Sequence, residues 1–355
     1  MYLRSLYLKN FRIYDEVAFD FSPQINMIWG ANARGKTTIL EAIHYLITGR
    51  SFRSSQPSDL IRAGESYFYI EGIFVKHGIE QRLKVSYDGK ERKIVYNSTN
   101  LQSATHLLGL LQGVLHTPDD VALVKGSPSI RRHFLDLQIA QADPLYVHHL
   151  TRYNQAMRQR NQLLRAKNVA SIHTWEHEMA NASAYIVTQR NRVISELNAS
   201  AIPLHDMLVS HQEPLLLGYT TSANPKDSLE VLKQYHLNLF QRNRKRELDL
   251  GLTLGGPHKD DLSISLCGKD VRQFASEGQQ RSFVSTLKIA EWSRLKAEAE
   301  DAPLMLIDDL GISLDPTRRK SLLNHLTSLD QVFLTFTQPT EMDCDESQVR
   351  LLEIV

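Results

Sequence analysis

A nine-residue stretch near the start of the chain, Gly30 to Thr38, constrains the fold more than any other feature. It reads Gly-Ala-Asn-Ala-Arg-Gly-Lys-Thr-Thr and fits the pattern G-x-x-x-x-G-K-[ST]. An apolar run over 25–29 precedes it, and residues 38–47 place apolar side chains at helical spacing. A strand, a glycine loop and a helix in this order turn backbone N–H groups onto a phosphate. The sequence therefore predicts a phosphate site in an α/β domain.

The residue types in this loop predict distinct roles. Glycines at both ends let the backbone turn and approach a ligand, the Lys36 ammonium reaches the β- and γ-phosphates, and the Thr37 hydroxyl is left to ligate Mg²⁺. Arg12, one predicted strand away, is a further candidate phosphate contact, and the alternative is a solvated arginine in a turn. The residues expected around the nucleotide are Gly30, Ala31, Asn32, Ala33, Arg34, Gly35, Lys36, Thr37, Thr38 and Arg12.

Length and composition bound the class of protein. With 355 residues the chain can form two domains, or one large domain with an insertion. A net charge of +1 predicts no wholesale attraction to nucleic acid, although it leaves local charge clusters open. Cys267 and Cys344 fit no metal or redox spacing, and neither a signal segment nor an apolar run of membrane-spanning length occurs. We therefore expect a cytoplasmic protein with no membrane partner.

Hydrophobic patterns predict two kinds of region. The N-terminal third reads as β-rich around one helix, with alternating strands over 2–8, 17–21, 67–75, 81–86 and 93–96. From about 104 to 247 the pattern is helical, most regularly over 146–166 and 174–197. A block of helices inserted into an α/β chain is expected to form a separate lobe.

Two basic stretches lie in the helical region. The first contains Arg152, Arg158, Arg160, Arg165 and Lys167, and the second contains Arg242, Arg244, Lys245 and Arg246. Basic helix faces are often merely solvated, which is one alternative. Clustering in a nearly neutral chain favours the other, contact with the phosphate backbone of nucleic acid. No pattern typical of base-specific recognition occurs.

The segment Ser276-Glu277-Gly278-Gln279 opens a predicted helix in the last third of the chain. Ser276 is a natural N-cap, so Ser276 and Gly278 present a second helix start able to bind an anion. Many helices begin with a serine cap, and the ordinary alternative is a cap without a ligand. Ser276, Gly278 and Gln279 are therefore candidate nucleotide contacts.

A buried strand over 303–307 ends in two adjacent carboxylates, Asp308 and Asp309. One carboxylate at the end of such a strand, Asp308, can hold Mg²⁺ directly or through water. The second, Asp309, can polarise a water for attack on the γ-phosphate. The predicted catalytic residues are therefore Lys36, Asp308 and Asp309, and the predicted metal ligands are Thr37 and Asp308.

With these three features in hand, the chain resembles the ABC-type ATPases of chromosome maintenance, and among them the RecF family. The resemblance runs nearly end to end. The glycine loop is common to many proteins, so more specific segments carry the resemblance. They are Leu8 to Arg12, Thr117 to Asp120, Lys125 to Pro128, Arg131 to Asp136, Gly256 to Asp261 and the 153–164 helix with its Arg160-Asn161 pair.

The resemblance implies an α/β, ABC-ATPase-like head without a coiled coil. Residues 1–110 and 295–355 would form a β-rich ATP-binding lobe from both chain ends. Residues 111–294 would form a mainly helical lobe that carries the Ser276–Gln279 motif. Lys36 and Ser276 are too far apart in the sequence for a transporter nucleotide domain, and the long heptad runs of SMC or Rad50 arms are missing.

The resemblance also implies a function. ATP and Mg²⁺ on the glycine loop of one subunit would be closed over by the Ser276–Gly278 turn of another, giving an ATP-dependent homodimer. Such a dimer would bind double-stranded DNA at gaps and single-strand/double-strand junctions. It would help load recombinase with RecR and RecO in recombinational repair, replication restart and the SOS response to DNA damage. A weak, DNA-dependent ATPase activity with slow turnover is expected.

One departure from the family concerns hydrolysis. Members usually carry Ser-Glu-Leu-Asp where this chain reads Ile312-Ser313-Leu314-Asp315, so Ser313 replaces a glutamate. Thr337 and Gln338 stand where transporters have a switch histidine. The alternatives are another SMC- or ABC-like ATPase, a nucleotide-binding module without significant hydrolysis, a metabolic P-loop kinase and a transporter ATPase.

Overall fold

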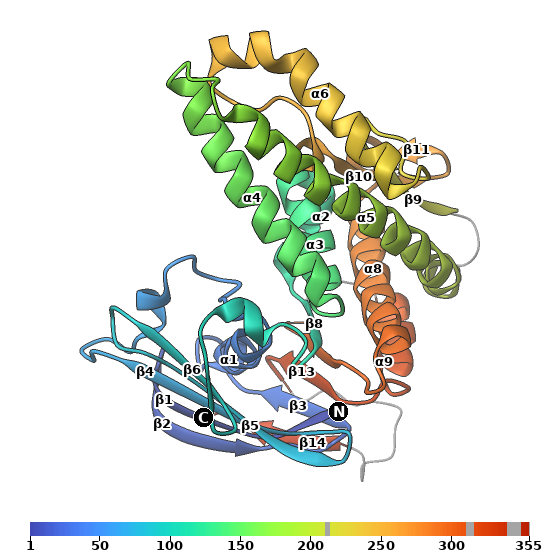
Figure 1. Cartoon of the computed structure of the whole chain (residues 1–355). Coiled ribbons are helices and arrows are strands. Elements are labelled where there is room, and N and C mark those ends of the chain that lie inside the picture. The colour runs from blue at the N-terminus through green and yellow to red at the C-terminus, as the bar shows by residue number, and fades with distance from the viewer. Residues whose placement is uncertain (210–213, 310–315, 339–348, 355) are drawn as a thin grey trace. The chain divides into compact units, whose positions relative to one another are not determined.

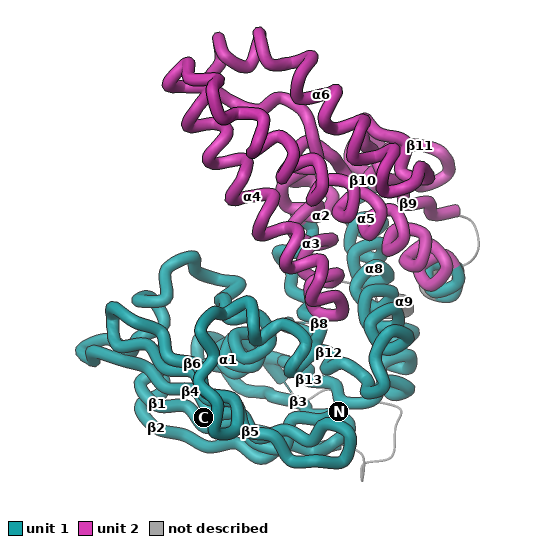
Figure 2. The backbone as a smooth tube through the Cα atoms, in the orientation of Figure 1, with its two compact units in different colours: residues 1–121, 203–213, 276–355 teal, residues 122–202, 214–275 magenta. Residues whose placement is uncertain are grey.

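The structure is a computed structural model that describes residues 1–209, 214–309, 316–338 and 349–354 (Figure 1). It divides into two compact units (Figure 2). Unit 1 contains residues 1–121, 203–213 and 276–355, and unit 2 contains residues 122–202 and 214–275. Within the described parts of the chain, no helix combines the length and apolarity that a membrane crossing requires.

A five-stranded parallel sheet brings the two ends of the chain together in unit 1. In spatial order its strands are β14 (Val349–Glu353), β3 (Ile25–Trp29), β13 (Val332–Phe336), β12 (Leu304–Ile307) and β8 (Gly113–His116). Strands β12 and β13 are buried at every position. Burial on both faces explains why they read as continuous apolar runs.

A six-stranded antiparallel sheet forms the other layer of unit 1. Its order is β2 (Tyr14–Asp20), β1 (Tyr2–Phe11), β4 (Phe68–Lys76), β5 (Ile79–Tyr87), β6 (Arg92–Tyr96) and β7 (Thr99–Leu101). Helix α1 (Lys36–Thr48) is buried at every position except Thr37, and its apolar side chains share one core with residues from both sheets. Each fully buried leucine or isoleucine there contributes about 1.5–3 kcal/mol, so α1 is firmly fixed.

The remaining elements of unit 1 are short turns and two helices. The turns are η1 (Pro57–Leu60), η2 (Ala104–Leu107) and η3 (Pro118–Val121). Helix α8 (Glu277–Glu298) packs along β8, and α9 is Pro316–Leu326.

Unit 2 consists of helices with a small antiparallel sheet. Helix α5 (Ile172–Val209) is 38 residues long, and the division between the units falls at its internal Pro203. Proline removes a backbone hydrogen bond inside a helix, which weakens the helix at that point. The other elements are α2 (Ala122–Lys125), α3 (Pro128–Ala140), α4 (Pro144–Arg165), α6 (Leu229–Leu250), η4 (Pro257–Lys259), α7 (Val271–Phe274) and the sheet β11 (Lys269–Asp270), β10 (Asp261–Leu266), β9 (Leu215–Thr220).

The compact units differ from the predicted lobes in three places, since unit 1 also contains residues 111–121, 203–213 and 276–294. We expected residues 111–294 to form the helical lobe, but α8 and the Ser276 turn belong to unit 1 because α8 packs along β8. The division into 1–110 with 295–355 and 111–294 stays a prediction about functional lobes. The region read as helical from 104 to 247 also contains β8 and β9, which the helical pattern missed.

Candidate nucleotide-binding site

The loop between β3 and α1 can be built only with glycine at its two ends. Gly35 is the N-cap of α1 at φ 102°, and a Cβ added there would lie 2.6 Å from Cδ1 of Ile13 and 2.7 Å from the hydroxyl of Tyr14. A Cβ on Gly30 (φ 152°) would lie 2.3 Å from the carbonyl oxygen of Ile354. Ala33 also has a positive φ of 64°. The close approach of Ile13, Tyr14 and Ile354 was not predicted from the sequence.

The donors at this loop fit a phosphate. Among the described residues, no side chain caps the start of α1, so the first-turn N–H groups stay available for an anion. The Lys36 ammonium is largely buried and donates to the carbonyl oxygens of Gly30 at 2.7 Å and Ala31 at 2.8 Å. Backbone N–H groups and an ammonium are all hydrogen-bond donors, which is the chemistry that a polyphosphate requires.

Asp308 and Thr37 meet beside this loop although 271 positions separate them in the sequence. The Thr37 hydroxyl donates to the two carboxylate oxygens of Asp308 at 3.0 and 3.1 Å. The Thr335 hydroxyl donates to the same carboxylate at 2.8 Å. Burial raises the pKa of Asp308, while the hydrogen bonds from Thr335 and Thr37 lower it. The structure thus places the two predicted metal ligands side by side.

This pair fits Mg²⁺ only if other oxygens complete the coordination. No group of three or more His, Cys, Asp or Glu side chains able to hold a metal occurs in the described part of the chain. Mg²⁺ prefers six oxygen ligands and commonly takes one or two from protein and the rest from phosphates and water. The hydroxyl of Thr37 and the carboxylate of Asp308 match the one or two ligands that a protein commonly supplies to Mg²⁺.

Asp309 follows in an unusual backbone conformation. Its φ is 50°, in the left-handed region, and its N–H donates to the Thr335 hydroxyl at 2.8 Å. Thr335 thus holds both acidic residues, and the sequence analysis missed it. The only sequence signal was a hydroxyl residue within the apolar strand 332–336. Positive φ at a residue other than glycine stores strain that often marks functional sites.

Arg12 has a structural partner on α1. Its Nε and Nη2 donate to the Glu41 carboxylate at 3.0 and 2.7 Å, and its Nη1 donates to the carbonyl of Asp59 at 2.8 Å. The Glu41 side chain is 0% exposed, and Arg53 lies 3.5 Å from it. Arg12 is therefore fixed as the counter-charge of a buried carboxylate, and its contact with phosphate stays a prediction. Glu41 was missed, although a glutamate inside an apolar helix was a visible signal.

Ser276 is the N-cap of α8, as predicted. Its Oγ accepts from the Gln279 N–H at 3.3 Å, and the Gln279 Oε1 accepts from the Ser276 N–H at 2.8 Å. This capping box uses the Ser276 hydroxyl and the Gln279 amide oxygen as hydrogen-bond acceptors. Ser276, Glu277 and Gly278 are exposed to solvent. Their contact with nucleotide stays a prediction. Ser313 and Asp315, on which the expected departure in hydrolysis depends, lie outside the described residues.

The structure corrects one part of the basic-face prediction. Arg160 is 0% exposed and donates to Glu176 at 2.9 Å, to Glu247 at 2.6 Å and to the Thr253 hydroxyl at 2.9 Å. It cannot contact DNA, because its guanidinium neutralises two buried carboxylates. Arg244 also pairs with Glu176.

Other cations of these stretches are exposed in unit 2. The ends of α4 and α6 meet, since the Arg165 Nε donates to the carbonyl of Gly251 at 3.4 Å. We define the basic end of unit 2 as the exposed Arg158, Arg165, Lys167, Arg242, Lys245 and Arg246. Arg152 pairs with Glu178 at 2.6 Å.

Three of the segments that carried the family resemblance, Arg131 to Asp136, the 153–164 helix and Gly256 to Asp261, make polar contacts with one another in unit 2. Arg131 forms a two-pronged ion pair with Asp261, with both distances 2.8 Å. The Tyr153 hydroxyl lies 2.6 Å from Nδ1 of His258. These segments therefore specify how unit 2 is held together.

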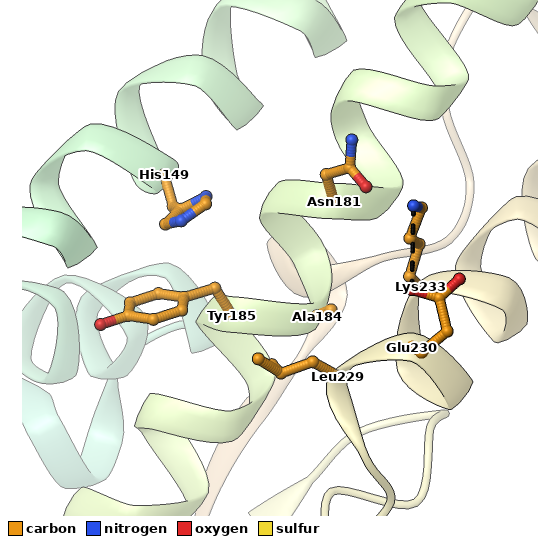
Figure 3. Close-up of a pocket in the computed structure, with 7 residues that line it drawn as sticks. All are labelled: His149, Asn181, Ala184, Tyr185, Leu229, Glu230 and Lys233. Carbon is orange, nitrogen blue, oxygen red and sulfur yellow. Dashed lines mark ion pairs between the residues drawn. The ribbon is translucent and has the colours of Figure 1, made fainter.

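A separate cavity of about 200 Å³ lies in unit 2 among α4, α5 and α6 (Figure 3). The rings of His149 and Tyr185 stack there at 4.5 Å. The residues that line it are His149, Asn181, Ala184, Tyr185, Leu229, Glu230 and Lys233. None of the predicted nucleotide residues is among them, so this cavity is distinct from the phosphate site.

The chain is similar along nearly its whole length to proteins called DNA replication and repair protein RecF. The relative from Protochlamydia amoebophila (strain UWE25) is 52% identical over 344 residues, which are 97% of this chain and 96% of that protein. The relative from Bacillus pumilus (strain SAFR-032) is 35% identical, over 97% of this chain and 95% of that protein. A family model described as an AAA domain matches residues 5–108.

Solved structures have the same fold. One described as the recombination mediator protein RecF–ATP in the RecFOR pathway has a TM-score of 0.90 and 31% identity, and the match covers 99% of this chain and 95% of that chain. An SMC head domain from Pyrococcus furiosus has a TM-score of 0.57 and 19% identity, over 95% of this chain and 90% of that chain, and supports the fold alone. The predicted α/β ATPase head fold is confirmed.

Proposed function

Because the chain belongs to the RecF family of DNA replication and repair proteins, we propose that it is an ATP-dependent DNA-binding protein of recombinational repair and replication restart. The observation that carries the proposal is the contact of Thr37 with Asp308 beside a loop whose free donors fit a polyphosphate. A P-loop lysine, a hydroxyl and a strand-ending carboxylate together are typical of nucleotide hydrolysis.

The residues at the loop would divide the work as follows. The first-turn N–H groups of α1 bind the phosphates, and the Lys36 ammonium exchanges its carbonyl partners for phosphate oxygens. Thr37 and Asp308 would hold Mg²⁺, which would supply positive charge beside the phosphates. Asp309 orients the attacking water. The exposed Ser276–Gly278 turn of a second subunit covers the nucleotide, so ATP drives dimerisation and slow, DNA-dependent hydrolysis reverses it.

The basic end of unit 2 is the proposed DNA surface. Its six cations are exposed, and arginine and lysine side chains of this kind bind the phosphates of a DNA backbone without reading its sequence. We place this activity in the cytoplasm, at gaps and single-strand/double-strand junctions, where the protein would help load recombinase with RecR and RecO. No membrane partner is proposed.

Sedimentation with and without MgATP tests the dimer. The wild type is expected to dimerise with ATP, Lys36→Met and Ser276→Arg are expected to stay monomeric, and Asp309→Asn is expected to form persistent dimers because hydrolysis is blocked. Phosphate release from the same samples separates a slow ATPase from a module that binds nucleotide without hydrolysing it. A wild type that is monomeric under all conditions would overturn the proposal.

A further inference from the structure

Helix α8 is joined to β8, the strand next to Asp308, and to the η3 turn that follows β8 by two polar contacts that the proposed function does not use. The helix begins at Ser276, the residue proposed to reach the second subunit, and packs along β8 (Figure 1). Most positions on α8 from Gln280 to Leu295 are buried, including several polar ones. Polar groups at such positions need partners, and two of these partners are His116 at the end of β8 and Asp120 in η3.

The first contact is made by His116, the last residue of β8, which is 6% exposed. Its Nε2 lies 2.9 Å from the Ser285 hydroxyl on α8. Its backbone carbonyl accepts the N–H of Asp308 at 2.8 Å. One residue thus connects α8 to the backbone of the predicted metal ligand.

The second contact lies one helical turn further along α8. The Lys288 ammonium lies 3.3 Å from the carboxylate of Asp120 and 3.8 Å from that of Glu291. The other oxygen of Asp120 accepts the N–H of Thr117 at 2.7 Å, directly after β8. Ser285 and Lys288 are three positions apart, so they lie on the same face of the helix.

The energetics indicate a role in position more than in stability. A buried ion pair contributes little net stability compared with apolar residues of the same size, because both charges lose their water. What it supplies is a fixed geometry, since either charge left alone is costly. Ser276 lies nine residues before Ser285, or about 14 Å along a rigid helix. A small change in how α8 meets β8 therefore moves the Ser276 turn.

We propose that the His116–Ser285 and Asp120–Lys288 contacts couple two parts of unit 1. When the edge of the sheet formed by β8 and β12, which carries Asp308, changes its arrangement, these contacts shift α8 and with it the position of Ser276. The four side chains act as positioning residues and do not touch nucleotide. The inference rests on the proposed ATP-dependent dimer. It predicts that breaking the coupling separates ATP binding from dimerisation.

The test compares Ser285→Ala and Lys288→Met with the wild type and with a matched control. Arg294→Met is the control, because Arg294 is also buried on α8 but pairs with Glu298 of the same helix at 2.6 Å. Three quantities are measured: the ATP affinity of the monomer, the dimer dissociation constant in MgATP, and the thermal unfolding midpoint. Ser285→Ala removes only one hydroxyl, so it keeps the test valid if Lys288→Met fails to fold.

We expect ATP affinity within twofold of the wild type and a dimer dissociation constant raised at least tenfold in both variants. The control should dimerise like the wild type, and Lys288→Arg should recover most of the loss. Unchanged dimerisation in Ser285→Ala and Lys288→Met, or equal loss in Arg294→Met, would overturn the inference while leaving the proposed function intact. A wild type that never dimerises would overturn both.

Discussion

The hydroxyl of Thr37 donates to both carboxylate oxygens of Asp308, across 271 positions of sequence. Thr37 follows the loop after β3, and Asp308 follows β12, with β13 between these strands in the sheet. Parallel strands deliver the residues after their carboxyl ends to one edge, so sheet order creates this contact. The hydroxyl and the carboxylate face each other where a Mg²⁺ ion would need both.

Replacing Asp308 by asparagine tests this assignment. The amide keeps the size of the side chain but removes the charge that would attract Mg²⁺, so affinity for MgATP is expected to fall at least tenfold. Affinity for ATP in the presence of a chelator should stay within about twofold, because the N–H groups and Lys36 are intact. Equilibrium binding of a fluorescent ATP analogue measures both. Equal losses with and without Mg²⁺ would argue against a metal role.

Replacing Gly30 by alanine is expected to disturb both fold and site. The new Cβ would meet the carbonyl oxygen of Ile354 at 2.3 Å, and Ile354 is held by the carbonyl of Trp29 through a 2.8 Å hydrogen bond. The free energy of unfolding should fall by roughly 2–4 kcal/mol, and ATP affinity should fall with it. Gly78→Ala is the control, since Gly78 has φ 73° but no atom within 4 Å of the added Cβ.

In urea titrations, Gly78→Ala should lower the free energy of unfolding by only about 1 kcal/mol, because alanine is less stable than glycine in a left-handed backbone conformation. If both substitutions cost the same, the contact between Gly30 and Ile354 contributes nothing.

Two arginines of α4 are expected to behave in opposite ways. Arg160→Met leaves Glu247 buried without its counter-charge and Glu176 with Arg244 alone, so the free energy of unfolding should fall by about 3–5 kcal/mol. Arg165→Glu should leave the free energy of unfolding within about 0.5 kcal/mol of the wild-type value. It should weaken binding to duplex DNA, and the slope of log affinity against log salt concentration should become shallower by about one. Urea unfolding and DNA titrations at several salt concentrations measure these effects.

Lys93→Glu is the control for Arg165→Glu. Lys93 is exposed on β6 in unit 1, and its replacement by glutamate changes the net charge by the same amount. DNA binding that falls equally in Lys93→Glu and Arg165→Glu would mean that only net charge matters.

The contrast between these arginines shows where sequence reasoning stops. The glycine loop, the Ser276 cap and the Asp308 strand end were all predictable, because each depends on neighbours within a few residues. Arg160 lies on the same helical face as the buried Tyr153 and Leu164, whereas Arg165 does not. What the local pattern could not show is that Glu176 and Glu247, 16 and 87 positions from Arg160, neutralise a guanidinium buried there.

Distant pairing also explains the other omissions. Thr335 donates a hydrogen bond to Asp308 because β13 lies beside β12. Glu41 forms an ion pair with Arg12 because the turn between β1 and β2 brings Arg12 to helix α1. Strands β9 and β10 pair across more than 40 positions, so a local hydrophobic pattern could not distinguish β9 from its helical surroundings.

The last prediction concerns acid stability and depends on the protonation of His258. A carbonyl oxygen only accepts, so Nε2 of His258 carries the proton and donates to Thr253 at 3.1 Å, and Nδ1 accepts from the Tyr153 hydroxyl at 2.6 Å. Burial lowers the pKa of His258 to about 4. An unfolded chain has a histidine pKa of about 6.5, so between pH 6.5 and 4 it binds a proton that the folded chain does not.

The free energy of unfolding should therefore include a His258 contribution that is complete above pH 6.5 and is lost as the pH falls towards 4. A shift of this size corresponds to at most about 3 kcal/mol. His258→Asn keeps an acceptor near Tyr153 but does not titrate, so it should be less stable than the wild type at pH 7.5 and lose about 1–3 kcal/mol less between pH 6.5 and 4. Urea unfolding at pH 7.5, 6.5, 5.5 and 4.5 measures the difference, in which the remaining titrating groups cancel because both chains share them. Parallel curves for the two chains would mean that the pKa of His258 is the same in the folded and the unfolded chain, which would contradict the prediction.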